Sequence, residues 1–433
     1  MNRDRGHIAN RILLILLMAV ITVAGLVYVL FTTSTIIIND THQETTISFS
    51  WWGNDDRNSY TLEGVQEFME KNPEIAVDTT YSVWSGYEQK ERIHMMSGTE
   101  PDLMQINYNW IHTYSPDGNG YYDLYQLGDT LDLTAYTDAD LAPAVVNGKL
   151  NGLPTSYNAT VFYFNKTIYD QYGLELPKTW EDLVADAKVL GQDGIYPLYM
   201  DRKHLFLSVL AWYEQKSGKT VFSSDDGSYI GDADTAAQLL SLYQTIIEDG
   251  VAPYPKDFGF DSYLKAKAAG AGFWASEAAR YTDDLTEDGY EMVLVDPMTT
   301  KDPARSPGWR VKPTMLYAIS AYTDHPEEAA KLLNFLVSDP DMASLQGLER
   351  GIPINRKAYE TLTEEGTLEG ADKAAGEQVI DRLQSDALMV PAMEDSDVID
   401  AFEDAGDRLL YDNGNLQDCA KDLDENWRAI VNS

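Results

Sequence analysis

The chain alternates between short apolar runs and longer stretches in which apolar residues recur at helical spacing. Runs typical of strands occur at residues 47–51, 75–83, 102–106, 147–154 and 161–165. Amphipathic helical patterns occur at residues 60–70, 179–190 and 326–337. Thr179 and Asp182 form a capping-box-like start for the second of these helices. The mixture of the two periods predicts an α/β fold.

An uninterrupted apolar run occupies residues 12–31 and follows Arg3, Arg5 and Arg11. It is long enough to cross a bilayer as a helix, and the positive charge before it places the rest of the chain outside the cytoplasm. The run is longer than the apolar part of most signal peptides, and no small-x-small site follows it directly. It therefore predicts a retained membrane anchor, whereas cleavage would give a secreted protein. The single cysteine, Cys419, excludes a lipid anchor after the run and an intrachain disulfide.

Length and charge narrow the class of protein. A chain of 433 residues with 44% hydrophobic content predicts two domains. The formal net charge of −38 argues against nucleic acid and favours a neutral or cationic ligand. The six histidines show no metal-ligand spacing, so no metal site and no cofactor is predicted. The acidic stretch at 223–234 does not match an EF-hand loop, and its affinity for calcium stays open.

Tryptophans and glycines stand after several predicted strands in a fixed order along the chain. The segments that carry this order read ISFSWWGNDDRN, GTEPDLMQINYNW, NGKLNGLPTSYNATVFYFN, GFWASEAARY, PGWRVKPTMLYAIS, HPEEAAKLLNFLVSD and LERGIPINRKAYETL. In order and spacing they resemble the family 1 extracellular solute-binding proteins, the carbohydrate-capturing receptors of bacterial ABC importers. The resemblance spans nearly everything after about residue 45. The lipidated cysteine that many relatives carry after the apolar run is missing here.

The resemblance implies a two-lobe periplasmic-binding-protein-like fold with hinge crossings, similar to maltose-binding protein and preceded by the N-terminal hydrophobic helix. Hinges are expected near Pro154, Gly308 and Gly351. The implied division is an N-terminal segment at 1–44, a first lobe at 45–155 completed by 308–350, and a second lobe at 156–307 completed by 351–433.

The same resemblance implies that a neutral sugar or oligosaccharide is captured between the lobes and delivered to transmembrane permease subunits. No catalytic residues are needed for this function. A binder of peptides or polyamines is the closer alternative, and polyamines would require cleft carboxylates opposite the aromatic residues. A secreted glycoside hydrolase would show similar aromatic residues but needs two carboxyl groups that flank the bond, and no such pair stands out among the 70 acidic residues.

Sugar recognition needs flat apolar faces together with fixed polar groups around the hydroxyls. Trp51 and Trp52 are adjacent at the end of the first predicted strand and therefore point to opposite faces, so one is expected in the core and Trp52 in the cleft. Asn54 and Asp55 follow at the carboxyl end, where ligands bind in open α/β sheets. Asp55 is explained equally well as a charge at a helix N-terminus.

Further candidates follow the next two strands. Trp84 and Tyr87 flank a predicted turn after the second strand, and Asn109 and Trp110 leave the far end of the third. Asp102 begins the third strand, where relatives carry an acidic residue, and a turn or cap partner is the alternative reading.

The remaining candidates lie at the expected crossings and in the second lobe. Tyr157 and Asn158 follow the first crossing, where ordinary turn chemistry is the alternative. Asp201 follows a short strand-like run. Trp180 and Trp427 are expected to pack internally, and Trp212 is undecided. The strongest candidates are Trp274, after a glycine-rich run, and Trp309, with Arg350 expected either to hydrogen-bond the ligand or to lock the hinge.

Overall fold

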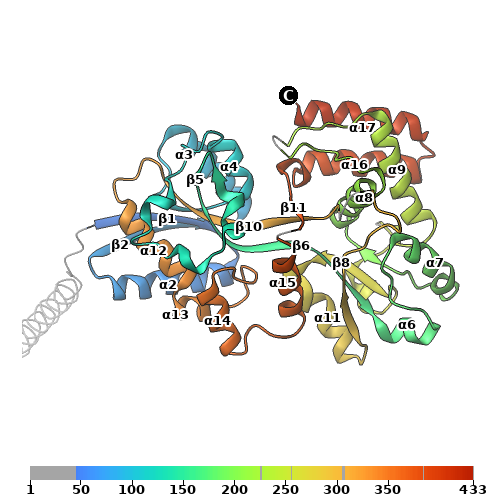
Figure 1. Cartoon of the computed structure of the whole chain (residues 1–433), viewed down its shortest axis with the longest axis horizontal. Helices are drawn as coiled ribbons and strands as arrows, with labels where there is room; N and C mark the ends of the chain where they lie inside the picture. Colours follow the sequence, from blue (N-terminus) through green and yellow to red (C-terminus); the bar gives the residue numbers. More distant parts are fainter. Residues whose placement is uncertain (1–44, 225–226, 255, 305–307, 384, 433) are drawn as a thin grey trace, which may run out of the picture.

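The computed structural model describes residues 45–224, 227–254, 256–304, 308–383 and 385–432. The chain folds into two α/β lobes that lie side by side and are joined by long strands (Figure 1). The apolar run at 12–31 lies outside the described residues. Within the described ranges, no helix combines the length and the apolar character needed to cross a membrane.

One sheet extends through both lobes in the order β2-β1-β3-β10-β6-β8-β7, with β11 beside β10 and β9 beside β6. The strands are β1 (Thr45–Trp52), β2 (Ile75–Ser82), β3 (Leu103–Ile106), β6 (Leu153–Asn165), β7 (Tyr199–Met200), β8 (Gly270–Trp274), β9 (Met292–Val295), β10 (Arg310–Ile319) and β11 (Ala387–Leu388). Strand β1 is parallel to β2 and β3, and β10 is antiparallel to β3 and β6. Two short strands, β4 (Val145–Val146) and β5 (Lys149–Leu150), form a separate hairpin.

Strands β6 and β10 cross between the lobes. The first part of β6 pairs with β10, and its last residues pair with β8 and β9 in the second lobe. All thirteen residues of β6 are buried. The sequence predicted two strands here, at 147–154 and 161–165. The second range lies within β6 and is confirmed as strand, whereas the first is divided between β5 and the start of β6, which is one continuous strand from 153 to 165. A strand buried on both faces shows no alternation that would mark its continuity.

The helices of the first lobe pack around β1, β2 and β3. They are α2 (Asp55–Lys71), α3 (Trp84–Ser97), α4 (Tyr108–Tyr114), α5 (Asp138–Leu141), α12 (Pro326–Ser338), α13 (Pro340–Gln346) and α14 (Arg356–Glu364). Helix α14 packs against α12 and α13. The predicted lobe boundaries remain an expectation.

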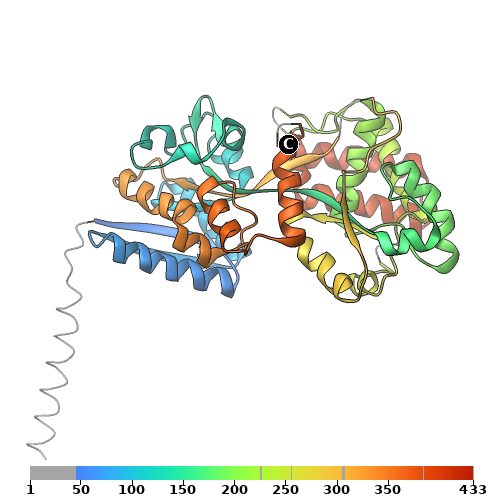
Figure 2. The ribbon, with the colours of Figure 1, turned by 60° about the horizontal axis from the view of Figure 1, so that its bottom comes forward.

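The helices of the second lobe are α6 (Lys166–Tyr172), α7 (Trp180–Leu190), α8 (Arg202–Ser217), α9 (Ala233–Glu248), α10 (Phe260–Leu264), α11 (Ala278–Glu287), α15 (Gly370–Arg382), α16 (Ser396–Tyr411) and α17 (Leu416–Val431). Helices α8, α9, α16 and α17 pack on one another. Helix α15 stands at the junction of the lobes and packs against β6 and α11 (Figure 2). The predicted capping box of Thr179 and Asp182 is present at the start of α7 and is confirmed.

Two hydrophobic clusters form the core. One contains Ile47, Phe49 and Trp51 of β1, and the other contains Phe162 and Phe164 of β6 together with the interior of the second lobe. The first cluster also contains Phe273 of β8 and Tyr281 of α11, so it continues from the first lobe across the junction into the second.

Candidate functional site

A cavity of about 330 Å³ opens between the two lobes where β6 and β10 cross. It is lined by Trp52, Arg57, Gln105, Asn158, Trp274, Ser276, Glu277, Lys312, Thr314, Met315, Leu348, Glu349, Arg350 and Gly351. We call this cavity the cleft pocket. Both lobes contribute to it, since Trp52 ends β1 in the first lobe and Trp274 ends β8 in the second.

Trp52 lines the cleft pocket from the first lobe, and further aromatic rings that do not line the pocket pack around it. Trp52 meets Trp84 edge to face, with 4.9 Å between ring centroids, and lies 5.4 Å from Tyr87. Trp84 and Tyr87 each lie 6.0 Å from Trp110. Tyr87 is buried and its hydroxyl donates to the Gln105 carbonyl at 2.6 Å. Trp84 is 37% exposed, so it offers a free ring face beside Trp52.

Strand alternation separates the two neighbouring tryptophans of β1. Trp51 is fully buried and its indole Nε1 donates to Asn58 Oδ1 at 3.0 Å. Trp52 is only half-buried and lines the cleft pocket. The division therefore follows the period of two along the strand, as the sequence predicted.

Trp274 forms the second-lobe wall. The ammonium groups of Lys203 and Lys312 lie 5.4 and 4.5 Å from its ring centroid, and the His204 ring meets it at 4.8 Å. Two glycines of β8 fix its position, because a Cβ on Gly272 would stand 2.7 Å from the Phe162 ring. The glycine-rich run thus lets β8 lie close against β6.

The two lysines share one carboxylate. Lys312 and Glu394 form an ion pair, and Lys203 Nζ lies 2.9 Å from Glu394 Oε1. Burial lowers the pKa of Lys312, and Lys203 lowers it further, whereas Glu394 opposes the shift. Burial alone would raise the pKa of Glu394, but the two lysines outweigh this effect and the net shift is downward. The cluster therefore carries two cations against one anion.

Arg350 lies at the first-lobe end of the cleft pocket and is only 4% exposed. Its Nη1 donates to Gln105 Oε1 at 2.7 Å, and its Nη2 donates to Thr61 Oγ1 at 3.2 Å. The Arg350 carbonyl accepts a hydrogen bond from Ser156 Oγ of the crossing strand. Arg350 thus contacts both the cleft pocket and the hinge, which are the two roles that the sequence left open.

The crossing strands present one face to the cleft pocket. Asn158 pairs with Lys312, and both residues line the pocket. Asn158 Nδ2 donates to Ser276 Oγ at 2.9 Å, which links the crossing to the second lobe. Tyr157 lies on the opposite face, where its hydroxyl donates to the Asp140 carbonyl at 2.8 Å. It does not line the cleft pocket, because neighbouring strand residues point to opposite faces, and its contact with a ligand remains a prediction.

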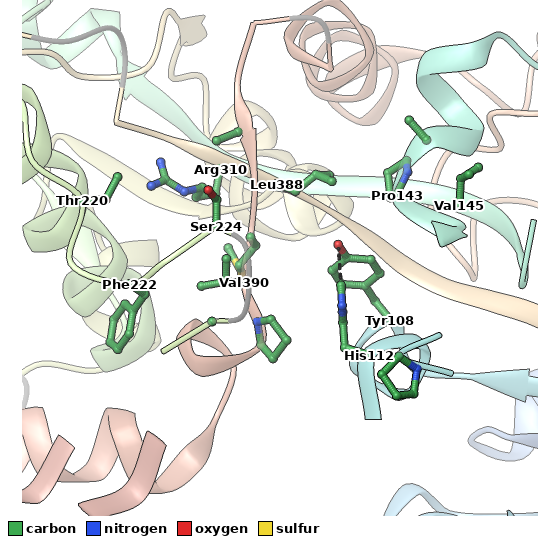
Figure 3. A pocket seen from close by; sticks show the side chains of 16 residues that line it. Tyr108, His112, Pro143, Val145, Thr220, Phe222, Ser224, Arg310, Leu388 and Val390 are labelled. Atoms are coloured by element: carbon green, nitrogen blue, oxygen red, sulfur yellow. Dashed lines mark hydrogen bonds between the residues drawn. The ribbon is translucent and has the colours of Figure 1, made fainter. Parts of the chain in front are cut away.

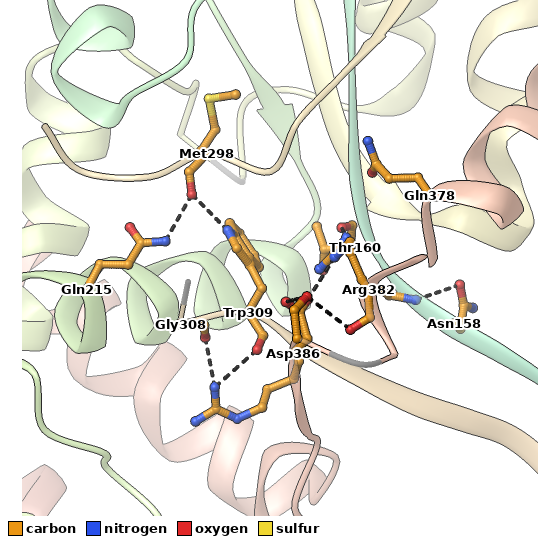
Figure 4. Close-up of polar contacts among 12 residues, drawn as sticks. Asn158, Thr160, Gln215, Met298, Gly308, Trp309, Gln378, Arg382 and Asp386 are labelled. Atoms are coloured by element: carbon orange, nitrogen blue, oxygen red, sulfur yellow. Dashed lines mark hydrogen bonds and ion pairs between the residues drawn. The ribbon is translucent and has the colours of Figure 1, made fainter. Parts of the chain in front are cut away.

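The predicted ligand residue Trp309 is also buried away from the cleft pocket. It is 3% exposed, its Nε1 donates to the Met298 carbonyl at 2.7 Å, and its ring packs on Phe162 and Trp180 (Figure 4). It belongs to the core of the second lobe and does not line the cleft pocket. Trp212 stacks on Trp180 in the same cluster, and Trp427 is fully buried elsewhere in the lobe.

Asp102 serves as a structural hydrogen-bond partner, in agreement with the alternative interpretation of this residue as a turn or cap partner. Its carboxylate accepts hydrogen bonds from Ser48 N at 2.7 Å and from the hydroxyls of Ser48 and Thr323. Burial alone would raise the pKa of Asp102, but these hydrogen bonds hold it below its ordinary value. The carboxylate ties β1, β3 and the turn after β10 together, so its acceptor sites are already used.

Four other candidates do not line the cleft pocket, and two of them cap helices. Asn54 caps α2 by accepting from Arg57 N, and Asp55 is an acidic residue in the first turn of that helix. Asp201 caps α8 and accepts from His204 N at 2.7 Å and Nδ1 at 2.8 Å. Asn109 lies half-buried on α4. Their contact with a ligand remains a prediction.

Several residues of the cleft pocket were missed from the sequence. They are Arg57, Gln105, Ser276, Glu277, Lys312, Thr314, Met315, Leu348, Glu349 and Gly351. The run RVKPT could have predicted Lys312 and Thr314, because Arg310, Lys312 and Thr314 alternate with buried residues along β10 and so share one face of the strand. The other residues carry no local signal, because they reach the pocket from unrelated elements.

A second, larger cavity of about 580 Å³ lies beside β11 (Figure 3). Tyr108 and His112 of α4 face it from the first lobe, and Phe222 lines it from the second. The Arg310 guanidinium on its border is paired with Glu214 at 2.6 Å. No tryptophan lines this cavity among the described residues, so it lacks the broad ring faces that distinguish the cleft pocket.

Two α/β lobes that are joined by crossing strands and have a pocket with aromatic residues between them define the class of two-lobe binding proteins. The chain belongs to the bacterial extracellular solute-binding protein family, whose model matches residues 53–343. The resemblance seen in the sequence is thereby confirmed. The family consists of binding proteins and implies an extracytoplasmic location for the chain.

Individual relatives agree with this assignment. The galactooligosaccharide-binding protein of Bacillus subtilis (strain 168) is 27% identical over 210 residues, which cover 47% of this chain and 48% of that protein. The chain thus spans about half the length of the curated relatives it matches. A periplasmic oligogalacturonide binding protein from Yersinia enterocolitica, in complex with saturated digalacturonic acid, is similar in structure with a TM-score of 0.74 and 29% identity, covering 90% of this chain and 99% of that one.

A de novo designed cysteine esterase is also similar in structure. It has a TM-score of 0.81 and 29% identity, and the match covers 90% of this chain and 99% of the designed one. This likeness concerns a designed activity and identifies no catalytic group in the present chain.

Proposed function

We propose that this protein is the extracytoplasmic binding component of an ABC importer, which captures a sugar or oligosaccharide in the cleft pocket and delivers it to a membrane permease. The observation that carries the proposal is that one aromatic ring from each lobe lines the same cavity, Trp52 from the first lobe and Trp274 from the second, with Trp84 packed edge to face on Trp52. Flat rings of this kind suit the C–H face of a pyranose, while Asn158 and Thr314 offer hydrogen-bonding groups for hydroxyls.

Binding and transport would be coupled through the hinge. A ligand that touches Trp52 and Trp274 at once makes its full set of contacts only when the lobes approach each other. Such a ligand shifts the population toward the closed form by the free energy of those additional contacts. The closed form is then the state that a permease distinguishes from the empty receptor.

The expected affinity for a sugar follows from the same aromatic rings. Each stacked ring contributes on the order of 0.5 to 1.5 kcal/mol beyond area burial, as aromatic pairs do. Two or three rings and several hydrogen bonds are consistent with micromolar affinity, about −8 kcal/mol. The bulk charge of the chain predicts that the sugar is neutral, and a ligand panel tests that refinement directly.

A polyamine receptor is disfavoured by the carboxylates at the cleft pocket, because each already has a cationic partner. Glu349 lies 3.8 Å from Arg57, and Glu277 lies 2.7 Å from Arg280. Glu394 lies between the two lysines. The same pairing disfavours a glycoside hydrolase, which needs one carboxyl group free to protonate the leaving group and a second to act on the sugar.

Localisation is the remaining part of the proposal. The apolar run at 12–31 would hold the receptor at the outer face of the cytoplasmic membrane, close to its permease. Fractionation of cells that express the full chain tests this directly. Intact mass of the membrane-bound protein, including residues 1–44, supports an anchor, whereas a shortened protein in the medium supports a cleaved signal peptide.

Thermal unfolding of the full chain with neutral and acidic oligosaccharides, polyamines and short peptides tests the function itself. A ligand at one hundred times its dissociation constant adds about 2.7 kcal/mol of stability. We expect one glycan family to give a saturable shift, to be recovered intact, and to lose its effect in Trp274→Ala. The control Tyr322→Ala removes an aromatic ring that is 72% exposed and does not line the cleft pocket. A shift from polyamines or peptides alone, or cleavage of the glycan, would refute the proposal.

A further inference from the structure

The charges around the cleft pocket do not balance. Its carboxylates are each matched by a cation, with Glu349 beside Arg57, Glu277 beside Arg280 and Glu394 beside Lys312. The Arg350 guanidinium has no such partner, since no carboxylate of the described residues lies within 4.0 Å of it. The pocket therefore retains an unneutralised cation, although the whole chain carries a formal net charge of −38.

Arg350 is held by neutral groups only. Its Nη1 donates to Gln105 Oε1 and to the Met315 sulfur, its Nη2 donates to Thr61 Oγ1, and its Nε is buried without a hydrogen-bond partner. A buried charge is costly unless an opposite charge or a full set of hydrogen bonds compensates it. The residue is 4% exposed and also lines the cavity, so the space beside it is the place where a compensating group can bind.

A second cationic excess lies across the pocket. Lys203 and Lys312 share the single carboxylate of Glu394, and Lys312 itself lines the cavity. The two excesses come from different lobes, since Arg350 follows α13 and Lys203 lies on α8. A ligand between the lobes therefore meets positive charge on both sides of the aromatic walls.

Inside the cleft pocket, the charged groups that line the cavity affect a ligand more strongly than the net charge of the whole chain does. Exposed charges are largely screened beyond about 10 Å at 0.1 M salt, whereas buried charges are screened much less. The many acidic residues on the outer surface therefore decide little inside the pocket. The prediction of a neutral ligand rests on those surface charges, and the groups that line the cavity lead to a different conclusion.

We propose that the ligand is an acidic sugar whose ring carboxylate binds at Arg350, so that the pocket selects uronic-acid units over neutral ones. A carboxylate is planar and accepts hydrogen bonds from a guanidinium in the same plane. In a uronic acid it replaces the hydroxymethyl group of the neutral sugar, so the ring face that stacks on Trp52 or Trp274 is unchanged. This inference rests on the proposed sugar-binding function.

Isothermal titration of the full chain in detergent at fixed ionic strength tests the inference. The probes are digalacturonic acid, its methyl ester, and the α-1,4-linked galactose disaccharide, which carries hydroxymethyl groups in place of the carboxylates. Hydrogen bonds to charged groups correspond to roughly a 10- to 150-fold change in affinity. We expect digalacturonic acid to bind at least about tenfold more tightly than either neutral probe.

Variants assign the selectivity to Arg350. Arg350→Gln should bring the three dissociation constants within about threefold of one another, while Arg350→Lys should keep part of the preference. Arg408→Gln is the control, because it removes the same charge from an ion pair on α16 that is 46% exposed. It should leave the preference unchanged. If Arg350→Gln does not fold, the comparison of acid and methyl ester on the wild-type chain still decides the question.

The outcomes separate the two proposals. Equal affinity for the acid, the ester and the neutral disaccharide overturns the inference and leaves the sugar receptor standing. A preference for the acid that persists in Arg350→Gln also overturns it. If no neutral or acidic oligosaccharide binds in this titration or in the wider thermal panel, the proposed function itself fails.

Discussion

The buried ion pair between Arg382 and Asp386 gives the most direct test of how the hinge is stabilised. Arg382 Nε lies 2.7 Å from Asp386 Oδ2, and the two side chains are only 9% and 2% exposed. Arg382 Nη1 also donates to the Thr160 carbonyl at 2.8 Å (Figure 4). The pair thereby joins the end of α15 and the start of β11 to the crossing strand β6.

Asp386→Asn keeps the shape of the side chain but removes its charge. Burial lowers the pKa of Arg382, and Asp386 acts in the opposite direction. Without Asp386 the guanidinium remains buried and uncompensated, which costs about 3–5 kcal/mol in comparable pairs. Each kcal/mol lost from the free energy of unfolding lowers the melting temperature of a lobe of about this size by about 2–4 °C, so we expect the melting temperature to fall by roughly 6–20 °C.

Scanning calorimetry and chemical unfolding measure this loss. Asp422→Asn is a matched control, because the Arg408–Asp422 pair has the same 2.7 Å contact but its side chains are 46% and 47% exposed. Exposed pairs contribute about 0–1 kcal/mol, so this variant should unfold close to the wild type. If Asp386→Asn loses no more stability than Asp422→Asn, the reasoning from burial is refuted.

Three further predictions follow from single positions. Burial raises the pKa of Asp186 to about 6. The folded state is therefore favoured while Asp186 is protonated, and this stabilisation is lost as the pH rises through 6. Asp186→Asn should stabilise the protein by about 1–2 kcal/mol at pH 7.5 and leave its stability unchanged near pH 3, which unfolding at the two pH values measures. Trp51→Ala should lower the free energy of unfolding by about 3–5 kcal/mol because its ring is fully buried, whereas Trp84→Ala should mainly weaken ligand binding. Equal losses of stability in the two variants would contradict the assignment of Trp84 to ligand binding. Gly272→Ala should destabilise the second lobe by about 1–3 kcal/mol in denaturant unfolding, because its Cβ would meet the Phe162 ring at 2.7 Å, and an unchanged midpoint would show that β8 can move away.

Local pattern was reliable where the feature itself is local. The α/β class, the capping box at Thr179 and the opposite orientation of Trp51 and Trp52 each depend on residues within a few positions of one another. The apolar pattern predicted α2 only from residue 60, whereas the helix begins at Asp55 after the N-cap Asn54, which agrees with the alternative interpretation of Asp55 as a charge at a helix N-terminus.

The cleft pocket depended on contacts between distant segments. Trp274 comes at the end of a glycine-rich run and Trp309 comes directly after Gly308, and the sequence ranked both as strong candidates. In the structure Trp274 lines the cleft pocket, whereas Trp309 lies in the core. Only the register of β6 against β10 and β8 decides which face of each strand is covered. The orientation of Tyr157 away from the cleft pocket has the same origin.

The sequence by itself determined the family, the two-lobe α/β organisation and the supply of aromatic residues, because these features depend on local periodicity and on the order of segments along the chain. The tertiary structure decided the charge of the cleft pocket. Arg350 and Gln105 are 245 positions apart, and Lys312 and Glu394 are 82 positions apart. The net charge of a chain sums over all its residues, whereas a ligand responds to the few buried groups that folding brings within hydrogen-bond distance.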